Sequence, residues 1–135
     1  MVVVVRGALM LVGLLFIGLG ATFLFDPVGQ GGDFGVAANG NQGLSTIRAD
    51  LTAYFWIAGG TLAIGAWRRD RTLLLVAAAL MAITFAARGM SLVADGPYEG
   101  WTMPMAVEAF TVIIALFGAR VLPQSSSVSD ESEMP

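Results

Sequence analysis

An arginine and a glutamate, Arg88 and Glu108, lie within two long apolar stretches of this 135-residue chain and could meet across the turn between them. Helices are expected from about residue 72 to 93 and from about 103 to 122, which places each charge about five residues from the turn. At 1.5 Å per residue, both charges then lie roughly 7 Å inside the helix ends. An unpaired charge in a membrane interior costs about 2.5–3.5 kcal/mol even on lenient scales, so mutual pairing is the favourable arrangement.

Further ionisable residues fall on the same side of the expected topology and could join this pair: Arg48, Asp50, Asp95 and Glu99. Three interpretations are open. Arg88 and Glu108 form a structural ion pair, or Arg88 extends its charge to the lipid headgroups, or the six residues line an outward-facing polar pocket. Such a pocket would suit an anionic or amphipathic small molecule, because arginine makes charge-assisted contacts with carboxylates and phosphates.

The residue types exclude several kinds of chemistry. The chain has no cysteine and no histidine, which removes disulfides, thiolate nucleophiles and the commonest general base and zinc or haem ligand. Carboxylates alone could hold Mg²⁺ or Ca²⁺, but the interleaved arginines oppose such a site. No nucleophile–base pair is evident. We therefore expect a non-enzymatic protein with no catalytic residue, no cofactor and no metal, and the lack of a polybasic run argues against nucleic acid as a partner.

The composition indicates that lipid is the solvent of this chain. Hydrophobic residues make up 56% of it and charged residues only 13%, against roughly 25% charged residues in soluble domains. A water-soluble domain of this size could not bury so many apolar side chains. The sequence therefore predicts an integral membrane protein.

Four stretches have about the length that a membrane-spanning helix needs, and they cover residues 2–25, 46–66, 72–93 and 103–122 approximately. Asp26-Pro27 is expected to end the first helix, Ser45 or Thr46 to cap the second, and Pro123 to end the fourth. The predicted fold class is all-α, an up-down-up-down bundle of four transmembrane helices with short connections.

The remaining segments are expected to be irregular. Residues 28–43 are rich in glycine and polar residues and are predicted to form an exposed loop. Residues 1–123 form the predicted transmembrane domain, and the acidic, serine-rich residues 124–135 are predicted to be disordered. The first stretch could also be a signal peptide, but no basic segment precedes it and no clear cleavage site follows it, which favours a retained helix. Gly13 and Gly20 share a face of that helix and would let a neighbour approach closely.

The arginines predict the orientation. They gather in the second turn and near the ends of the apolar region, at Arg68, Arg69, Arg71, Arg6 and Arg120. Because basic residues mark cytoplasmic loops, both termini are predicted to be cytoplasmic. The glycine-rich loop and the turn at residues 95–100 then lie outside.

Five segments carry a resemblance to a known family: residues 18–27 (GLGATFLFDP), 43–60 (GLSTIRADLTAYFWIAGG), 65–74 (GAWRRDRTLL), 87–100 (ARGMSLVADGPYEG) and 104–109 (PMAVEA). Together they resemble the small bacterial membrane proteins grouped as the domain of unknown function DUF4345. The resemblance covers roughly Gly7 to Pro123. It implies a four-helix bundle in the bacterial inner (plasma) membrane, loosely similar to the DoxX-like proteins, with no established activity. The family's polar positions fall on Arg48, Asp50, Arg88, Asp95, Gly96, Pro97, Glu99 and Glu108.

Two functions of different classes follow from these observations. The first is a non-enzymatic membrane protein whose outward polar pocket binds a membrane lipid or a small amphiphile. The alternative is a structural or accessory subunit that packs against a membrane-protein partner. The first needs its glycines and alanines inside its own bundle, whereas the second leaves a stripe of them facing outward. A transporter-like unit is less favoured, because the chain has few helices and no inverted repeat.

Overall fold

The computed structural model describes the backbone of residues 1–133 and the side chains of residues 1–123. Within these residues the secondary structure is entirely helical. The elements are α1 (Val2–Phe25), α2 (Pro27–Asp33), α3 (Gly40–Thr46), the π-helical segment η1 (Ile47–Leu51), α4 (Thr52–Arg68), α5 (Arg71–Asp95) and α6 (Thr102–Glu133). The predicted all-α class is therefore confirmed.

Three helices are long and apolar enough to cross a membrane, and they are Val2–Phe25, Arg71–Asp95 and Thr102–Pro123. Between 17% and 33% of the residues in their most apolar windows are buried inside the protein. Most of their leucine, valine, isoleucine and phenylalanine side chains are therefore at least partly exposed, as is expected of helices that are solvated by lipid.

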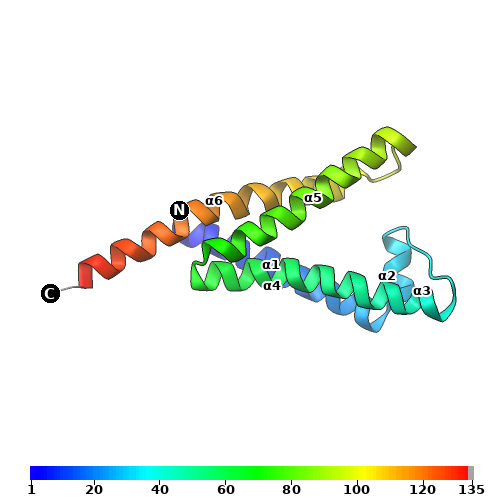
Figure 1. Ribbon diagram of the computed structural model, residues 1–135, viewed down its shortest axis with the longest axis horizontal. Helices are drawn as coiled ribbons and strands as arrows, with labels where there is room; N and C mark the ends of the chain where they lie inside the picture. Colours follow the sequence, from blue (N-terminus) through cyan, green and yellow to red (C-terminus); the bar gives the residue numbers. More distant parts are fainter. Residues whose placement is uncertain (134–135) are drawn as a thin grey trace.

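The long helices form two pairs (Figure 1). One pair consists of α1 and α4, and the other of α5 and α6. We call the end that carries the α4–α5 turn, Arg69 and Asp70, the closed end, because the pairs pack against each other there. At the opposite end, which carries α2 and the turn at residues 96–101, the pairs diverge, and we call it the open end. The chain starts at the closed end.

The core shared by both pairs lies toward the closed end. Side chains from all four long helices are fully buried there, and they include Leu9, Leu62, Ala66, Leu74, Ala77, Ala115 and Leu122. Toward the open end, the α1–α4 pair carries its own aromatic cluster. Phe23 stacks on Phe55 with ring centroids 5.6 Å apart, and Phe34, which follows α2, meets both rings edge-on.

Glycines set the close packing of α1 on α4. A Cβ atom added to Gly13 would lie 2.7 Å from the Gly59 carbonyl oxygen, closer than real Cβ contacts come. A Cβ added to Gly59 would strike the Gly13 carbonyl oxygen, and one added to Gly20 would strike the Trp56 ring. Gly13 and Gly20 thus provide the close approach that their spacing predicts.

Arg6 connects the two helices of this pair at the closed end. Its Nε donates to the Ala66 carbonyl oxygen at 3.1 Å and its Nη2 to the Trp67 carbonyl oxygen at 2.8 Å. The guanidinium carbon lies 5.5 Å from the centre of the Trp67 ring. A cation at the C-terminal end of α4 satisfies carbonyl groups that have no partner within the helix.

The segment between α1 and α4 differs from the predicted loop. α1 ends at Phe25, but α2 follows at once, because the Asp26 carboxylate accepts from the Gly29 amide at 3.0 Å and Pro27 occupies the first helical position. Both are favourable at a helix start. The signals that predicted a stop after α1 therefore also start a new helix.

The predicted cap of the second long helix is also wrong. Helical structure begins at Gly40 and continues through η1 into α4. Thr46 lies inside it and donates to the Gln42 carbonyl oxygen at 3.0 Å. A threonine can make this bond within a helix, so its presence alone does not indicate a cap.

The fourth helix does not end at Pro123 as predicted, since α6 passes through this proline to Glu133. Proline removes one main-chain donor and disfavours a helix interior without forbidding it. The predicted disorder of residues 124–135 falls outside the residues whose side chains the structure describes.

Candidate functional site

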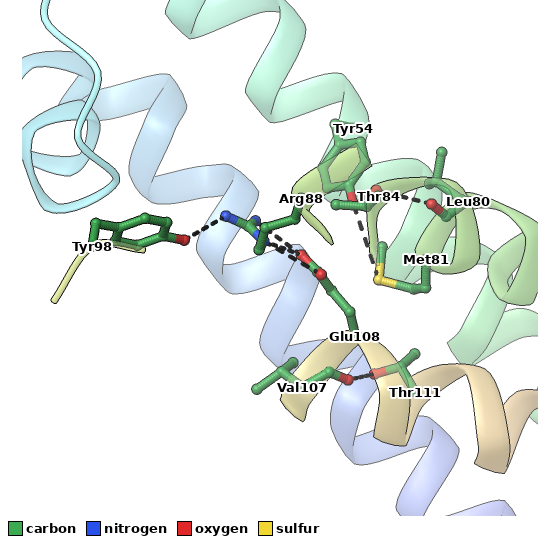
Figure 2. Close-up of polar contacts among 9 residues, drawn as sticks. All are labelled: Tyr54, Leu80, Met81, Thr84, Arg88, Tyr98, Val107, Glu108 and Thr111. Carbon is green, nitrogen blue, oxygen red and sulfur yellow. Dashed lines mark hydrogen bonds and ion pairs between the residues drawn. The ribbon is translucent and has the colours of Figure 1, made fainter. Parts of the chain in front are cut away.

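Arg88 and Glu108 form an ion pair between α5 and α6 near the open end (Figure 2). Arg88 Nη2 lies 2.9 Å from Glu108 Oε1, and Arg88 Nε donates to Oε1 at 3.0 Å and to Oε2 at 3.4 Å. Nε and Nη2 thus converge on the single oxygen Oε1, and the longer contact from Nε is the one that reaches Oε2. Each residue lies about two turns inside its helix, at roughly 9–10 Å depth, so the predicted meeting of the two charges is confirmed.

The two partners differ in exposure. The side chain of Glu108 is 8% exposed and that of Arg88 is 29% exposed. A buried carboxylate is stable only when charged or polar partners replace its lost water, and Arg88 supplies them. The Arg88 side chain, in contrast, still presents part of its surface outward.

Tyr98 is the third member of the cluster. Tyr98 lies in the turn that joins α5 to α6, and its hydroxyl oxygen accepts a hydrogen bond from Arg88 Nη1 at 3.1 Å. Gly96 and Gly100 flank it with φ values of 96° and 80°, a region that glycine adopts without strain. Tyr98 was not among the residues that the sequence analysis proposed for the site, although it lies in the turn at residues 95–100.

A second set of polar contacts lies beside the ion pair and joins α4 to α5 (Figure 2). The hydroxyl groups of Tyr54 and Thr84 are 2.6 Å apart, and Thr84 also donates to the Leu80 carbonyl oxygen at 2.9 Å. Tyr54 is within electrostatic reach of both Arg88 and Glu108. Tyr54 and Thr84 were also missed as site residues, because helical periodicity cannot show which faces of two helices meet.

The other predicted acidic residues of the turn stay outside this cluster. Asp95 is exposed and accepts from the Ser91 hydroxyl at 2.9 Å, one helical turn earlier on α5. Glu99 is exposed as well. Within the described part of the chain, neither carboxylate is hydrogen-bonded to Arg88.

Arg48 and Asp50 lie in η1, on the other helix pair. Arg48 Nε donates to the Leu24 carbonyl oxygen of α1 at 2.9 Å, and Asp50 is exposed. Among the described residues, no ion pair joins either one to Arg88 or Glu108. Because the two helix pairs diverge at the open end (Figure 1), the six predicted residues do not form one cluster.

The chemistry open to the cluster is that of binding. An arginine has five N–H donors, and the described contacts of Arg88 use the Nε–H and one N–H on each terminal nitrogen. Two donors remain for an outside acceptor. Within the described residues, no three acidic side chains are grouped so that they could hold a metal ion.

In comparisons with protein-family models, with curated proteins and with solved structures, nothing matches this chain.

Proposed function

We propose that this chain is a non-enzymatic protein of the bacterial inner membrane that binds the anionic group of a lipid or small amphiphile at Arg88. In this proposal the acceptor is a carboxylate or phosphate, and it takes the two N–H donors of Arg88 that Glu108 and Tyr98 leave unused. The resemblance to the DUF4345 proteins belongs to the same proposal.

Four membrane crossings form part of the proposal. The stretch Gly40–Arg68 is the fourth crossing, in addition to α1, α5 and α6. It is helical throughout, as α3, η1 and α4, and it exceeds the roughly 20 residues that a span needs. The arginines of the closed end then lie in the cytoplasm, as do both termini, and the open end faces outward.

The observation that carries ligand binding is the difference in exposure between Arg88 and Glu108. A purely structural pair inside a membrane is best covered by the protein on both sides, because an unused polar donor finds no water there. Here the carboxylate is buried and paired with Arg88, whereas the Arg88 side chain is partly exposed and keeps two unused N–H donors. This is the arrangement expected where a buried acid orients an arginine toward an external anion.

The placement of the glycines also supports binding. Gly13, Gly20, Gly59, Gly65 and Gly118 pack against neighbouring helices of the same chain. These five glycines are therefore used within the protein, which favours a self-contained binding protein over a subunit that needs a partner to cover them.

One observation favours the accessory-subunit alternative. An added Cβ at Gly7 or Gly18 of α1 would meet nothing within 4 Å, and both glycines lie on an exposed face together with Leu11 and Leu14. A partner helix could approach α1 closely on this face. The alternative predicts a stoichiometric protein partner after extraction in mild detergent.

The test is native mass spectrometry of the protein extracted gently from its own membrane. We expect a small retained mass on the wild type that falls at least tenfold in Arg88→Lys, because lysine keeps the charge opposite Glu108 but lacks the planar fork. Arg120→Lys, on the exposed surface of α6, is the matched control and retains the mass. A wild type without any adduct, or equal retention in Arg88→Lys, would refute the proposal.

A further inference from the structure

A groove lies on the outer surface of the α1–α4 pair, near the open end and away from Arg88. Its volume is about 420 Å³, and it is bounded by Leu24 of α1 and by Ser45, Arg48, Ala53 and Trp56 of the opposing helix. Its lining is mostly apolar except for Arg48, Ser45 and the buried Thr52, whose hydroxyl donates to the Gly20 carbonyl oxygen. The groove therefore combines an apolar floor with one cationic group at its edge.

Arg48 is held in place yet has unused donors. Its Nε donates to the Leu24 carbonyl oxygen, which fixes the side chain across the space between α1 and η1. Within the described part of the chain, its terminal nitrogens have no hydrogen-bond partner, and neither has the exposed Ser45 hydroxyl. Arg48 carries five N–H groups and the hydroxyl one, so several donors face the same edge of the groove.

The π-helical segment η1 is an independent observation that points to the same place. Arg48 lies inside it, directly after Ile47, which is buried against Gly31 of α2. Single π-helical turns within α-helices occur frequently at functional sites. Asp50, two residues later, does not line the groove, and among the described residues no ion pair joins it to Arg48.

The length of the groove fits half of a bilayer. Ser45 and Trp56 are eleven positions apart, about 16 Å along the helix, and the hydrocarbon core of one leaflet is about 15 Å thick, half of roughly 30 Å. Arg48 and Ser45 lie at the end near the membrane surface and Trp56 at the deeper end. A lipid with its headgroup at the Arg48 end and an acyl chain toward the Trp56 end would match the polarity of the lining.

We propose that this groove binds one anionic phospholipid, with its phosphate on Arg48 and Ser45 and an acyl chain along Ala53 and Trp56. This site does not depend on the one proposed at Arg88, because the two lie on different helix pairs and share no residue.

The test adds defined probes to delipidated, purified protein and counts the bound molecules by native mass spectrometry. The probes are phosphatidylglycerol, phosphatidylcholine with matched chains, and inorganic phosphate. In an Arg88→Lys background, which lacks the other proposed anion site, we expect one phosphatidylglycerol to be retained, at least tenfold more than phosphatidylcholine, and no retention of inorganic phosphate. Equal retention of the two lipids, or retention of phosphate alone, would overturn the proposal.

Variants separate the charge from the shape of the groove. Arg48→Gln removes the charge, and Ala53→Trp fills the floor without changing a charge; each is expected to lower retention of phosphatidylglycerol at least tenfold. Ala53 is exposed, so Ala53→Trp should shift the thermal midpoint by less than about 3 °C. Arg48→Gln also loses the hydrogen bond to the Leu24 carbonyl oxygen, so its midpoint should fall by about 2–8 °C. Arg120→Gln is the matched control with the same loss of charge. Equal losses in Arg120→Gln, or unchanged retention in either groove variant, would show that binding does not use this groove.

Discussion

Main chain meets main chain where α1 crosses α4, whereas α5 and α6 are joined near the open end by side chains of opposite charge. The first contact depends on Gly13 and Gly59, which leave no room for a Cβ atom between the helices. The second pair has space to spare, since a Cβ added to Gly89 of α5 would meet only the Met105 Cε atom, at 3.9 Å.

This difference shows two ways to hold helices together in an apolar solvent. Lipid tails are as apolar as leucine, so burial of apolar side chains gives little net attraction between membrane helices. The α1–α4 pair gains van der Waals contact through small residues. The α5–α6 pair gains a charge-assisted bond, which is strong in low dielectric but leaves a buried carboxylate dependent on a single partner.

The largest effect on stability is expected when Glu108 loses its charged partner. Arg88→Ala should lower the free energy of unfolding by about 3 kcal/mol, because the buried Glu108 loses its counter-charge. The measurement is unfolding in mixed micelles of mild detergent and SDS. In a double-mutant cycle, adding Glu108→Ala should restore part of the loss; strictly additive losses would mean that the two residues do not interact.

The glycine contact predicts the next largest effect. Gly59→Ala should cost about 1–3 kcal/mol, because its Cβ would press against the main chain of α1 at Gly13 and helices must move apart. Gly60→Ala is the matched control, since an added Cβ there meets nothing within 4 Å. The same unfolding assay compares the two variants, and a Gly59→Ala protein as stable as the wild type would contradict the close-contact description of this pair.

Tyr98→Phe tests the outermost contact of the charged pair. It removes the hydroxyl that accepts from Arg88 Nη1 and should cost about 0.5–1.5 kcal/mol, the usual value of one hydrogen bond. Tyr98 is exposed, so the effect should lie near the lower limit. A loss as large as that of Arg88→Ala would mean that Tyr98, and not Glu108, is the main partner of the arginine.

The smallest effect on stability is expected at Gly89, on the more loosely packed helix pair. Gly89→Ala, on the helix that carries Arg88, should leave stability unchanged or raise it by about 0.5–1 kcal/mol, because alanine is the better helix former and the site has room. A loss equal to that of Gly59→Ala would show that both helix pairs depend on close main-chain contact.

Much of this architecture could be predicted from local properties of the chain. Apolar length predicts α1, α5 and α6 as candidate spans, and the spacing of glycines predicts the close face of α1. The pairing of Arg88 with Glu108 follows from equal depth on consecutive antiparallel helices, because the turn between them fixes which charges can meet.

The predictions that were wrong concern features that depend on how the helices pack, which the local sequence does not determine. The sequence analysis placed Arg48 and Asp50 with Arg88 because all lie near the same end of their helices. Equal depth does not fix the lateral separation of the helix pairs, which depends on how far apart the larger side chains hold them. The start of α2 at Pro27 was missed for a related reason, since the same proline that ends one helix can begin another.

The position of the ion pair also has a consequence for how the protein is made. Arg88 and Glu108 are 20 residues apart, and at about 5–20 residues per second a ribosome needs roughly 1–4 s to add them. Throughout that interval the arginine is already synthesised and its carboxylate is not. Tyr98, ten residues after Arg88, becomes available halfway through, so the first partner that the nascent arginine can meet is the neutral hydroxyl, and α5 and α6 are best suited to enter the bilayer together as a hairpin.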